Sequence, residues 1–282
     1  MERIAVIADV HADWRALKSV ALEIERRGID RVWCLGDWVS GGPQPKRAFD
    51  WVLSNCEQIL IGNHELFVTA RAWERRNVVN GEINAAATAF RELGRRRVDR
   101  LYGFDAYALT DHAELVHGAL TAPADDFVSS RAQAELNLSL LKRPLLLFAH
   151  THQPALWEPA ARPGALKRRI RVEADYELAL STAKADRRLL NPGAVCDPDG
   201  ARWLELTFDG DRSRVTAAWH RTGVPGHGRP NGAHRADPRR GVRTPVAGTR
   251  DAALEARPGD GFAGPPAGSR RPRSTSGFQP GI

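Results

Sequence analysis

Apolar and polar positions in the first part of the chain follow a pattern that predicts strands joined by helices. Residues 3–9 (RIAVIAD) form an apolar run of the length of one strand. Apolar side chains then recur at the i, i+3, i+4 and i+7 spacing of one buried helix face: Leu17, Val20, Ala21 and Ile24. Asp13 is placed to cap the start of this helix and Gly28 its end.

The same pattern occurs again further along the chain. Residues 31–37 (RVWCLGD) predict a second strand, Pro45 opens a second helix, and residues 58–65 (QILIGNHE) predict a third strand. The inward face of the second helix consists of Ala48, Phe49, Val52 and Leu53. Strands and helices that alternate in this way form βαβ units, so we expect a mostly parallel sheet flanked by helices.

Helices and two more apolar strands follow. Residues 66–100 look helical and rich in arginine, which fits an exposed charged helix face better than a lid over phosphate. A fourth strand should end in residues 114–118 (ELVHG), and residues 131–142 predict another helix. The five apolar residues 145–149 then have the character of a strand that is buried on both faces.

After residue 154 the pattern changes to strict alternation. Residues 169–181 and 202–219 alternate apolar and polar side chains, the second segment around a turn at Asp209-Gly210. We therefore expect antiparallel strands here, with Leu204, Leu206 and Phe208 on one face. The pattern predicts a domain over residues 1–220 that ends in a second, antiparallel-leaning sheet.

The net charge of +7 belongs to the end of the chain. Residues 221–282 contain eleven Arg and four acidic residues, so the preceding 220 residues are neutral overall. Half of the 18 Pro and 12 of the 25 Gly also lie there, with few side chains that could form a core. We expect a disordered tail, solvated rather than bound to nucleic acid, with at most weak binding of polyanions.

The cysteines do not indicate a zinc site, and the apolar segments do not indicate a membrane span. Cys34, Cys56 and Cys196 lack the CxxC spacing of a thiolate zinc site and are expected to be ordinary small buried residues. No stretch has the length of a membrane span, and the first strand begins close to Met1, which leaves no room for a signal peptide. We expect a cytoplasmic protein without a membrane partner.

Metal-binding side chains stand at the ends of the predicted strands. The set is Asp9, His11, Asp37, Asn63, His64, His117, His150 and His152. Because the carboxyl ends of parallel strands line one crevice, these side chains should converge in space. A single histidine after a strand is more often structural, but here five of the nine histidines share that placement.

The ligand types indicate the chemistry. Carboxylates, an amide oxygen and imidazoles suit borderline divalent ions such as Mn, Fe, Ni or Zn, of which manganese is the expected one. Even without His64, the seven other candidate ligands are too many for one ion with open positions. Two ions bridged by one carboxylate fit the number and are the arrangement used to displace a leaving oxygen from phosphorus. The sequence thus predicts hydrolysis of a phosphate ester.

The motifs ADVH, LGDWVSGGPQP, IGNHE, LVHG and AHTH, in this order, resemble those of the calcineurin-like metallophosphoesterases. LNPGAV after them resembles that family's NPGS-type element. The resemblance covers about residues 3–220. It implies an α/β fold, a four-layer αββα sandwich of two mixed β-sheets flanked by helices.

The resemblance also implies a role for each residue. Asp9, His11 and His152 would hold one metal, Asn63, His117 and His150 the other, and Asp37 would bridge the two ions. His64 would be the non-ligand histidine that protonates the leaving oxygen or stabilises developing charge. Glu65 stands where many members have Asp, and we expect it to orient His64.

Departures from the family motifs indicate which branch of the family the sequence is more similar to. The protein Ser/Thr phosphatases and the symmetrical diadenosine tetraphosphatases supply two arginines to the phosphate, where this chain has Ser40-Gly41-Gly42 and Ile61-Gly62. The sequence is more similar to the small bacterial and archaeal phosphodiesterase-type branch. Ala149 replaces the usual Gly before His150, and we expect an ordinary backbone there, with His150 still bound.

The leading hypothesis is a dinuclear phosphodiesterase that hydrolyses a small nucleotide-like ester with metal-activated water. Two alternatives stay open: a non-catalytic metal-binding scaffold of the same fold, and a dinucleoside polyphosphate hydrolase or phosphoprotein phosphatase. A scaffold need not keep the ligands, and all seven are present together with His64.

Overall fold

The strand and helix repeat at the start of the chain builds part of the first of two sheets. The computed structural model describes residues 1–70, 81–159, 166–170, 176–181 and 186–224. In the first sheet β1 pairs in parallel with β2 and β2 with β3, while the remaining pairs are antiparallel. The strand order is β3-β2-β1-β11-β12-β9. The strands span β1 Glu2–Ile7, β2 Arg31–Cys34, β3 Gln58–Ile59, β9 Tyr176–Ser181, β11 Ala201–Phe208 and β12 Arg214–Thr222.

The second sheet has the strand order β4-β5-β6-β10-β7-β8. Its central strands β5, β6 and β10 are parallel, and antiparallel strands lie on both sides of them. The strands span β4 Tyr107–Leu109, β5 Ala113–Val116, β6 Leu145–Leu147, β7 Ala155–Pro159, β8 Leu166–Ile170 and β10 Arg188–Asn191. Both sheets are therefore mixed, as predicted.

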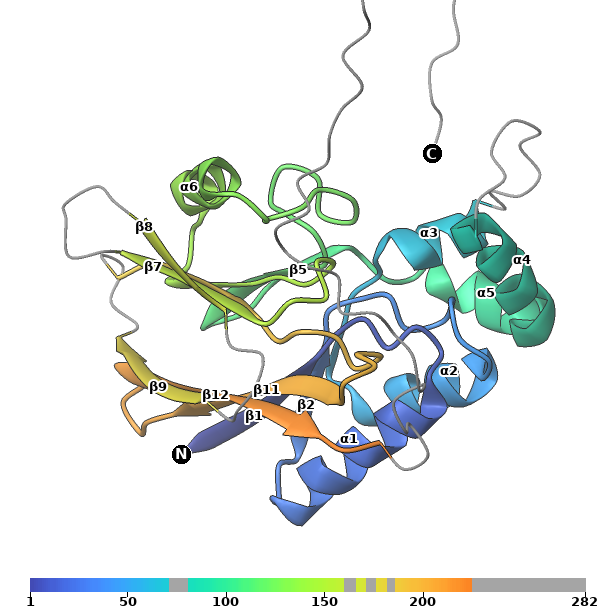
Figure 1. Cartoon of the computed structure of the whole chain (residues 1–282), viewed down its shortest axis with the longest axis horizontal. Coiled ribbons are helices and arrows are strands. Elements are labelled where there is room, and N and C mark those ends of the chain that lie inside the picture. Colours follow the sequence, from blue (N-terminus) through green and yellow to red (C-terminus); the bar gives the residue numbers. More distant parts are fainter. Residues whose placement is uncertain (71–80, 160–165, 171–175, 182–185, 225–282) are drawn as a thin grey trace, which may run out of the picture. The chain divides into compact units, whose positions relative to one another are not determined.

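The helices lie on the outer faces of the two sheets and in a group at one end of the sandwich (Figure 1). They span α1 Trp14–Arg26, α2 Pro45–Asn55, α3 Asn63–Thr69, α4 Gly81–Leu93, α5 Arg95–Leu101 and α6 Arg131–Leu140. The predicted cap of α1 is confirmed, because the Asp13 carboxylate accepts a bond of 3.0 Å from the Ala16 N–H. Gly28 follows this helix with a φ of 63°, a conformation that glycine adopts without strain.

Buried apolar side chains form three layers between these elements. One lies between the first sheet and α1 and α2 and includes Leu17 and Phe49. The second lies between the sheets and joins Ile4 of the first to Leu147 of the second. The third packs α6, through Ala134, on the outer face of the second sheet. This confirms the four-layer αββα sandwich (Figure 1).

The end of the domain is antiparallel, as predicted, but it is not a second sheet, because β11 pairs with β1 and so extends the first sheet. β11 and β12 make a hairpin in which Phe208 pairs with Val215. Leu204, Leu206 and Phe208 share the face that packs between the sheets. Alternation alone specifies that face, because successive side chains of a strand point to opposite sides.

Two elements differ from the prediction. β3 ends at Ile59, and Asn63 already opens α3, because Glu65 accepts the Gly62 N–H (2.9 Å) as a helix N-terminal residue would. The segment 169–181 contributes to two strands in different sheets, since β8 pairs with β7 and β9 with β12. Alternation identifies a strand with two unlike faces but not the sheet it joins.

The chain divides into two units, Met1–Ala233 and His234–Ile282. Residues 225–282 lie outside the described residues, so the tail at 221–282 stays a prediction beyond the end of β12. Among the described residues, no helix has the length and apolar character needed to cross a membrane.

Candidate metal centre

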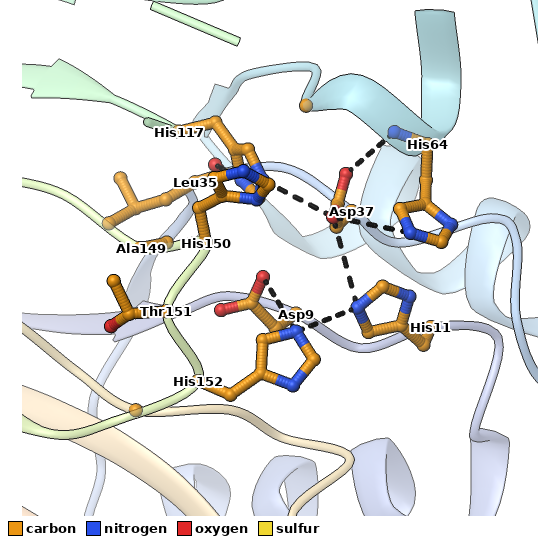
Figure 2. Close-up of polar contacts among 12 residues, drawn as sticks. Asp9, His11, Leu35, Asp37, His64, His117, Ala149, His150, Thr151 and His152 are labelled. Atoms are coloured by element: carbon orange, nitrogen blue, oxygen red, sulfur yellow. Dashed lines mark hydrogen bonds and ion pairs between the residues drawn. The ribbon is translucent and has the colours of Figure 1, made fainter. Parts of the chain in front are cut away.

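The polar residues that follow the predicted strands lie close together, as the labelled aspartates and histidines in Figure 2 show. They reach this place from both sheets. Asp9 and His11 follow β1 and Asp37 follows β2, while His117 follows β5 and His150 and His152 follow β6. Asn63 and His64 form the first turn of α3. All eight residues are therefore delivered to the same region by strand ends or by a helix start.

The backbone of this region is strained. In the described part of the chain, non-glycine residues with positive φ are Asp9, His11, Ala12, Asp37, His150, His152 and Arg212, and all except Arg212 belong to these loops. Each such conformation costs roughly 1–3 kcal/mol and persists where the surroundings hold it, typically at functional sites. Ala149 is not among them, so its backbone is ordinary, and the strain falls on the two histidines instead.

Two glycines allow the loops to come close together. A Cβ atom on Gly62 would collide with Oδ1 of Asp37, and one on Gly36 would lie 2.8 Å from Nδ1 of His117. Gly36 also has a φ of 108°, which side chains rarely tolerate. The glycines thus permit a packing of Asp37 against His117 that no larger residue would allow.

Three of the histidines are held by backbone carbonyl groups. Nδ1 of His117 donates to the Leu35 oxygen (2.9 Å), and Nδ1 of His11 donates to the Ser40 oxygen (3.0 Å). His150 uses its other nitrogen, Nε2, toward the Asp125 oxygen (3.1 Å). A ring that donates from one nitrogen presents a lone pair at the other, which is how metal-binding histidines are oriented.

The free nitrogens of these rings face one another in pairs. Nε2 of His117 lies 3.2 Å from Nδ1 of His150, and Nε2 of His11 lies 3.1 Å from Nε2 of His152. Two nitrogens that bind one ion at about 2.1 Å and at right angles would be about 3 Å apart. The spacing within each pair therefore matches a shared cation, whereas two bare lone pairs would repel.

Asp37 lies between the two pairs (Figure 2). Its Oδ2 is 3.2 Å from Nε2 of His117 and 3.8 Å from Nε2 of His11. Ligand atoms of Asp37, His117 and His150 lie within 4.8 Å of one another, and so do those of His11, Asp37 and His64. One carboxylate thus belongs to both groups, as a bridging ligand would.

Asp9 and Asn63 carry buried oxygen atoms that accept no hydrogen bond from the residues that the structure describes. Asp9 is fully buried, and neither of its carboxylate oxygens has a hydrogen bond. Oδ1 of Asn63 is also buried without one. An unpaired carboxylate in a protein interior is costly unless a cation compensates it. Oxygen and nitrogen donors of this kind fit divalent ions such as Mn, Fe, Ni or Zn.

Burial and the neighbouring charges shift the pKa of these groups. Burial, followed by the charge of Asp37, raises the pKa of Asp9 to about 8. Burial lowers the pKa of His11 and of His150 to about 4, so both rings are neutral at neutral pH. Burial opposes protonation of His117 as well, but Asp37 outweighs it and raises the pKa to about 9. A cation, either a proton or a metal, is therefore favoured beside Asp37.

Glu65 has a different task from the one expected. Its carboxylate accepts four backbone N–H bonds, from Asp37 (2.8 Å), Trp38 (2.7 Å), Val39 (3.0 Å) and Gly62 (2.9 Å). Within the described part of the chain, Nδ1 of His64 has no hydrogen-bond partner, and Glu65 makes no bond to this ring nitrogen. Glu65 instead fixes the loop that presents Asp37. The sequence could not distinguish these roles. His64 is the neighbour of Glu65 along the chain, whereas the loop of Asp37 is its neighbour only in the fold.

Glu65→Gln should disrupt this loop. An amide keeps one acceptor oxygen and turns a donor toward two of the four N–H groups. Leaving two buried donors unpaired should lower the free energy of unfolding by about 2–6 kcal/mol. Urea unfolding and the metal content of the same sample measure the effect. Glu82→Gln, at an exposed position of α4, is the control, and a Glu65→Gln protein with unchanged stability and metal content would contradict this role.

The AHTH turn is held by Asn191, which belongs to the LNPGAV element. Its side-chain amide donates to the Ala149 oxygen (2.9 Å) and to Oγ1 of Thr151 (3.2 Å), and its own oxygen accepts from the Gly193 N–H (2.8 Å). The positions of His150 and His152 therefore depend on a residue some forty positions later. The motif resemblance indicated the element but not this function.

Sequence reasoning missed two residues beside the centre. Phe127 is 47% exposed and stacks on His150, with 3.9 Å between ring centroids and 21° between ring planes. Sγ of Cys196 lies within 4.8 Å of ring nitrogens of His11 and His152. Nothing in the sequence around either residue indicates a role at the centre. Phe127 lies in a loop without apolar periodicity, and Cys196 is far from His11 and His152 in the sequence.

The four histidines that do not follow a predicted strand are His112, His220, His227 and His234. His112 contacts Glu2 (3.2 Å) and stacks on Phe208, while His220 contacts Glu205 (3.2 Å). Both are structural contacts within or beside the first sheet. His227 and His234 lie outside the described residues.

Known proteins are similar to this chain in sequence and in structure. A family model described as calcineurin-like phosphoesterase matches residues 2–174. An uncharacterised protein of Methanocaldococcus jannaschii is 38% identical over 69 residues, 24% of this chain and 28% of that protein. A symmetrical bis(5'-nucleosyl)-tetraphosphatase of Hamiltonella defensa is 25% identical over 171 residues, 57% of this chain and 61% of that protein. The chain thus spans less than two thirds of either relative.

Two solved structures share the fold. A metallophosphoesterase from Sphaerobacter thermophilus aligns with a TM-score of 0.64 at 25% identity, covering 79% of this chain and 89% of that one. A hypothetical protein from Pyrococcus horikoshii OT3 aligns with a TM-score of 0.58 at 15% identity, covering 80% and 90%. Both alignments extend beyond the 173 residues that the family model matches, which places the later strands in the same fold.

Proposed function

The chain belongs to the calcineurin-like phosphoesterase family, and we propose that it uses the centre at the strand ends to hydrolyse a phosphodiester. Asp9, His11 and His152 hold one divalent ion in this proposal. Asn63, His117 and His150 hold the other, and Asp37 bridges them. Two such ions supply positive charge that stabilises the attacking and leaving oxygens of an in-line displacement at phosphorus.

One observation carries the proposal. Two pairs of imidazole nitrogens face each other at 3.2 and 3.1 Å on either side of one buried carboxylate. In three of these rings the opposite nitrogen is engaged by a backbone carbonyl group. A proton can join the two nitrogens of a pair, whereas a divalent ion bound by each pair also offsets the buried carboxylates of Asp9 and Asp37.

His64 is the proton donor in this scheme. Its backbone N–H donates to Oδ1 of Asp37 (3.0 Å), which fixes the start of α3 against the bridge. Nε2 of the ring lies 4.0 Å from Oδ2 of Asp37, and Nδ1 is buried without a hydrogen-bond partner. A ring so close to the bridge, with a nitrogen to spare, can hold a proton for the departing oxygen.

Phe127 supports a substrate that carries an aromatic or nucleobase group. An exposed aromatic ring that lies flat on His150 offers a stacking surface beside one ion position. Ser40-Gly41-Gly42 and Ile61-Gly62 replace the arginines that would grip a phosphoprotein or a diadenosine tetraphosphate. A small nucleotide-like diester fits both features better than a phosphoprotein does.

Phe127→Ala should weaken binding of aromatic substrates selectively. Base–aromatic stacking is worth about 1–3 kcal/mol, so KM for bis-para-nitrophenyl phosphate should rise about tenfold or more. KM for glycerophosphocholine, a diester without an aromatic group, should change little. Phe127→Tyr keeps the ring and is the matched control. An equal loss for both substrates together with lost metal would mean that Phe127 only supports His150.

A panel of substrates separates the candidate functions. It consists of cyclic nucleotides, dinucleoside polyphosphates, and model mono- and diesters, each tested with Mn, Ni and Zn. The proposal expects diesters to be hydrolysed faster than monoesters. Preference for dinucleoside polyphosphates would favour the alternative that the relative from Hamiltonella defensa suggests by its name. Metal binding without hydrolysis of any substrate would indicate a scaffold.

A further inference from the structure

Cys196 is brought to the metal centre by backbone pairing between two distant segments. The loop after β10 lies against the end of β1, where the Val195 N–H donates to the Ala8 oxygen (3.0 Å) and the Cys196 N–H to the Asp9 oxygen (3.1 Å). Its sulfur atom and ring nitrogens of His11 and His152 all lie within 4.8 Å of one another. A thiol therefore stands beside two of the ligands assigned above to one ion.

An independent observation points to a cation at this place. Asp9 is fully buried, neither of its carboxylate oxygens accepts a hydrogen bond from a side chain or backbone that the structure describes, and its Oδ1 has only an ion-pair contact of 3.6 Å with Nε2 of His152. The two imidazoles and the sulfur atom thus surround one position, and the Asp9 carboxylate lies beside it, next to the His152 ring. Cys196 is only partly buried, so an ion can reach this position from solvent.

We propose that Cys196 is a further ligand of the ion held by Asp9, His11 and His152. The inference rests on the proposed function for the presence of that ion. Binding forms a bond between the sulfur atom and the ion, and the thiol proton is released to water, since the thiolate is the ligand. Neither the strand-end pattern nor the resemblance includes this residue.

A thiolate changes which metal this position favours. Carboxylate and water ligands suit Mn²⁺, whereas thiolates select softer ions such as Zn²⁺. The position beside Cys196 should therefore favour Zn²⁺ over Mn²⁺. The opposite position, formed by Asn63, His117 and His150, has only oxygen and nitrogen donors. The two positions are thus chemically unlike, and a mixed pair of ions fits them better than two Mn²⁺ ions.

The other cysteines supply a control. Cys34 is fully buried within β2, and Cys56 is partly buried at the end of α2. Among the described residues, neither belongs to a group of side chains that could hold a metal ion. Cys56→Ser therefore removes a partly exposed thiol of the same chain without touching the centre.

Cobalt absorption tests the ligation directly. The full chain is loaded with two equivalents of Co²⁺, and the bound metal is counted. We expect a sulfur-to-cobalt charge-transfer band in the near ultraviolet for the wild type and for Cys56→Ser. The band should be lost in Cys196→Ser and in Cys196→Ala, while circular dichroism confirms that both variants are folded. Bound Co²⁺ without the band in the wild type, or a band that persists in both variants, would overturn the inference.

Metal competition gives a second readout. Cys196→Ser should lower the affinity for Zn²⁺ by about tenfold or more and leave that for Mn²⁺ within about threefold, because only the softer ion gains from sulfur. Equal losses for both metals would contradict the selective role. A wild-type chain that binds no metal at all would overturn the proposed function as well, whereas metal binding without sulfur ligation overturns only this inference.

Discussion

Replacing Asp37 with Asn should cut the hydrolysis of bis-para-nitrophenyl phosphate about a thousandfold or more. The Oδ2 atom of Asp37 lies between the His117 and His11 nitrogens, and its neighbours are the ligands of both proposed ions. An amide of the same shape is neutral and presents a single acceptor oxygen. Metal ions contribute several kcal/mol to a phosphoryl transition state, which corresponds to about a thousandfold in rate.

Metal content should fall in the same variant. We expect the wild type to bind two ions per chain and Asp37→Asn to bind one or none, measured by elemental analysis after gel filtration. Asp50→Asn is the control, because Asp50 is an exposed carboxylate that pairs with Arg97 on the surface. Two tightly bound ions and undiminished turnover in Asp37→Asn would exclude a bridging role.

His64→Ala should have the second largest effect, and a different one. General acid catalysis contributes about a hundredfold to ten-thousandfold, so kcat should fall by a factor in this range. Metal content should stay at the wild-type value, because His64 is not among the proposed ligands. The separation of rate from metal content distinguishes a proton donor from a ligand.

The leaving group sharpens this prediction. A para-nitrophenolate leaves without much help from an acid, whereas an alkoxide needs a proton. The defect of His64→Ala should therefore be larger for an alkyl diester than for bis-para-nitrophenyl phosphate. His112→Ala is a matched control, since that ring contacts Glu2 within the fold. An equal defect for both leaving groups, or a loss of metal, would assign His64 another role.

The local sequence determined those features of the fold that depend on periodicity. Three local patterns were enough to predict the elements that contain them. They are the helical spacing and the Asp13 cap of α1, the alternation of β11, and the apolar run of β6. The convergence of the strand ends also followed from the sequence, because parallel strands present their carboxyl ends at one edge.

Features that depend on contacts between distant segments could not be predicted in this way. The segment 169–181 enters two sheets because partner choice is decided by the whole sandwich and not by its own alternation. Glu65 binds the loop of Asp37 because the loop after β2 meets the first turn of α3, which spacing alone does not reveal. Cys196 reaches the centre through pairing between the β10 loop and β1.

The strain at His150 and His152 answers a question that the sequence raised about Ala149. A glycine before this pair would have suggested that the turn begins there. The positive φ angles lie instead at the two histidines, and Asn191 holds the turn through the Ala149 oxygen. His150 consequently lies beside His117 and His152 beside His11, as the proposed assignment of the two residues to different ions requires.

The most direct test of the dinuclear centre is a metal titration of the metal-free full chain. Bound metal and hydrolysis of bis-para-nitrophenyl phosphate are measured on the same samples, with Mn²⁺ and with Zn²⁺. We predict that hydrolysis appears as the second equivalent binds and disappears when a chelator removes the ions. Full hydrolysis by the metal-free chain, or no hydrolysis of any diester by a chain that holds two ions, would contradict the account.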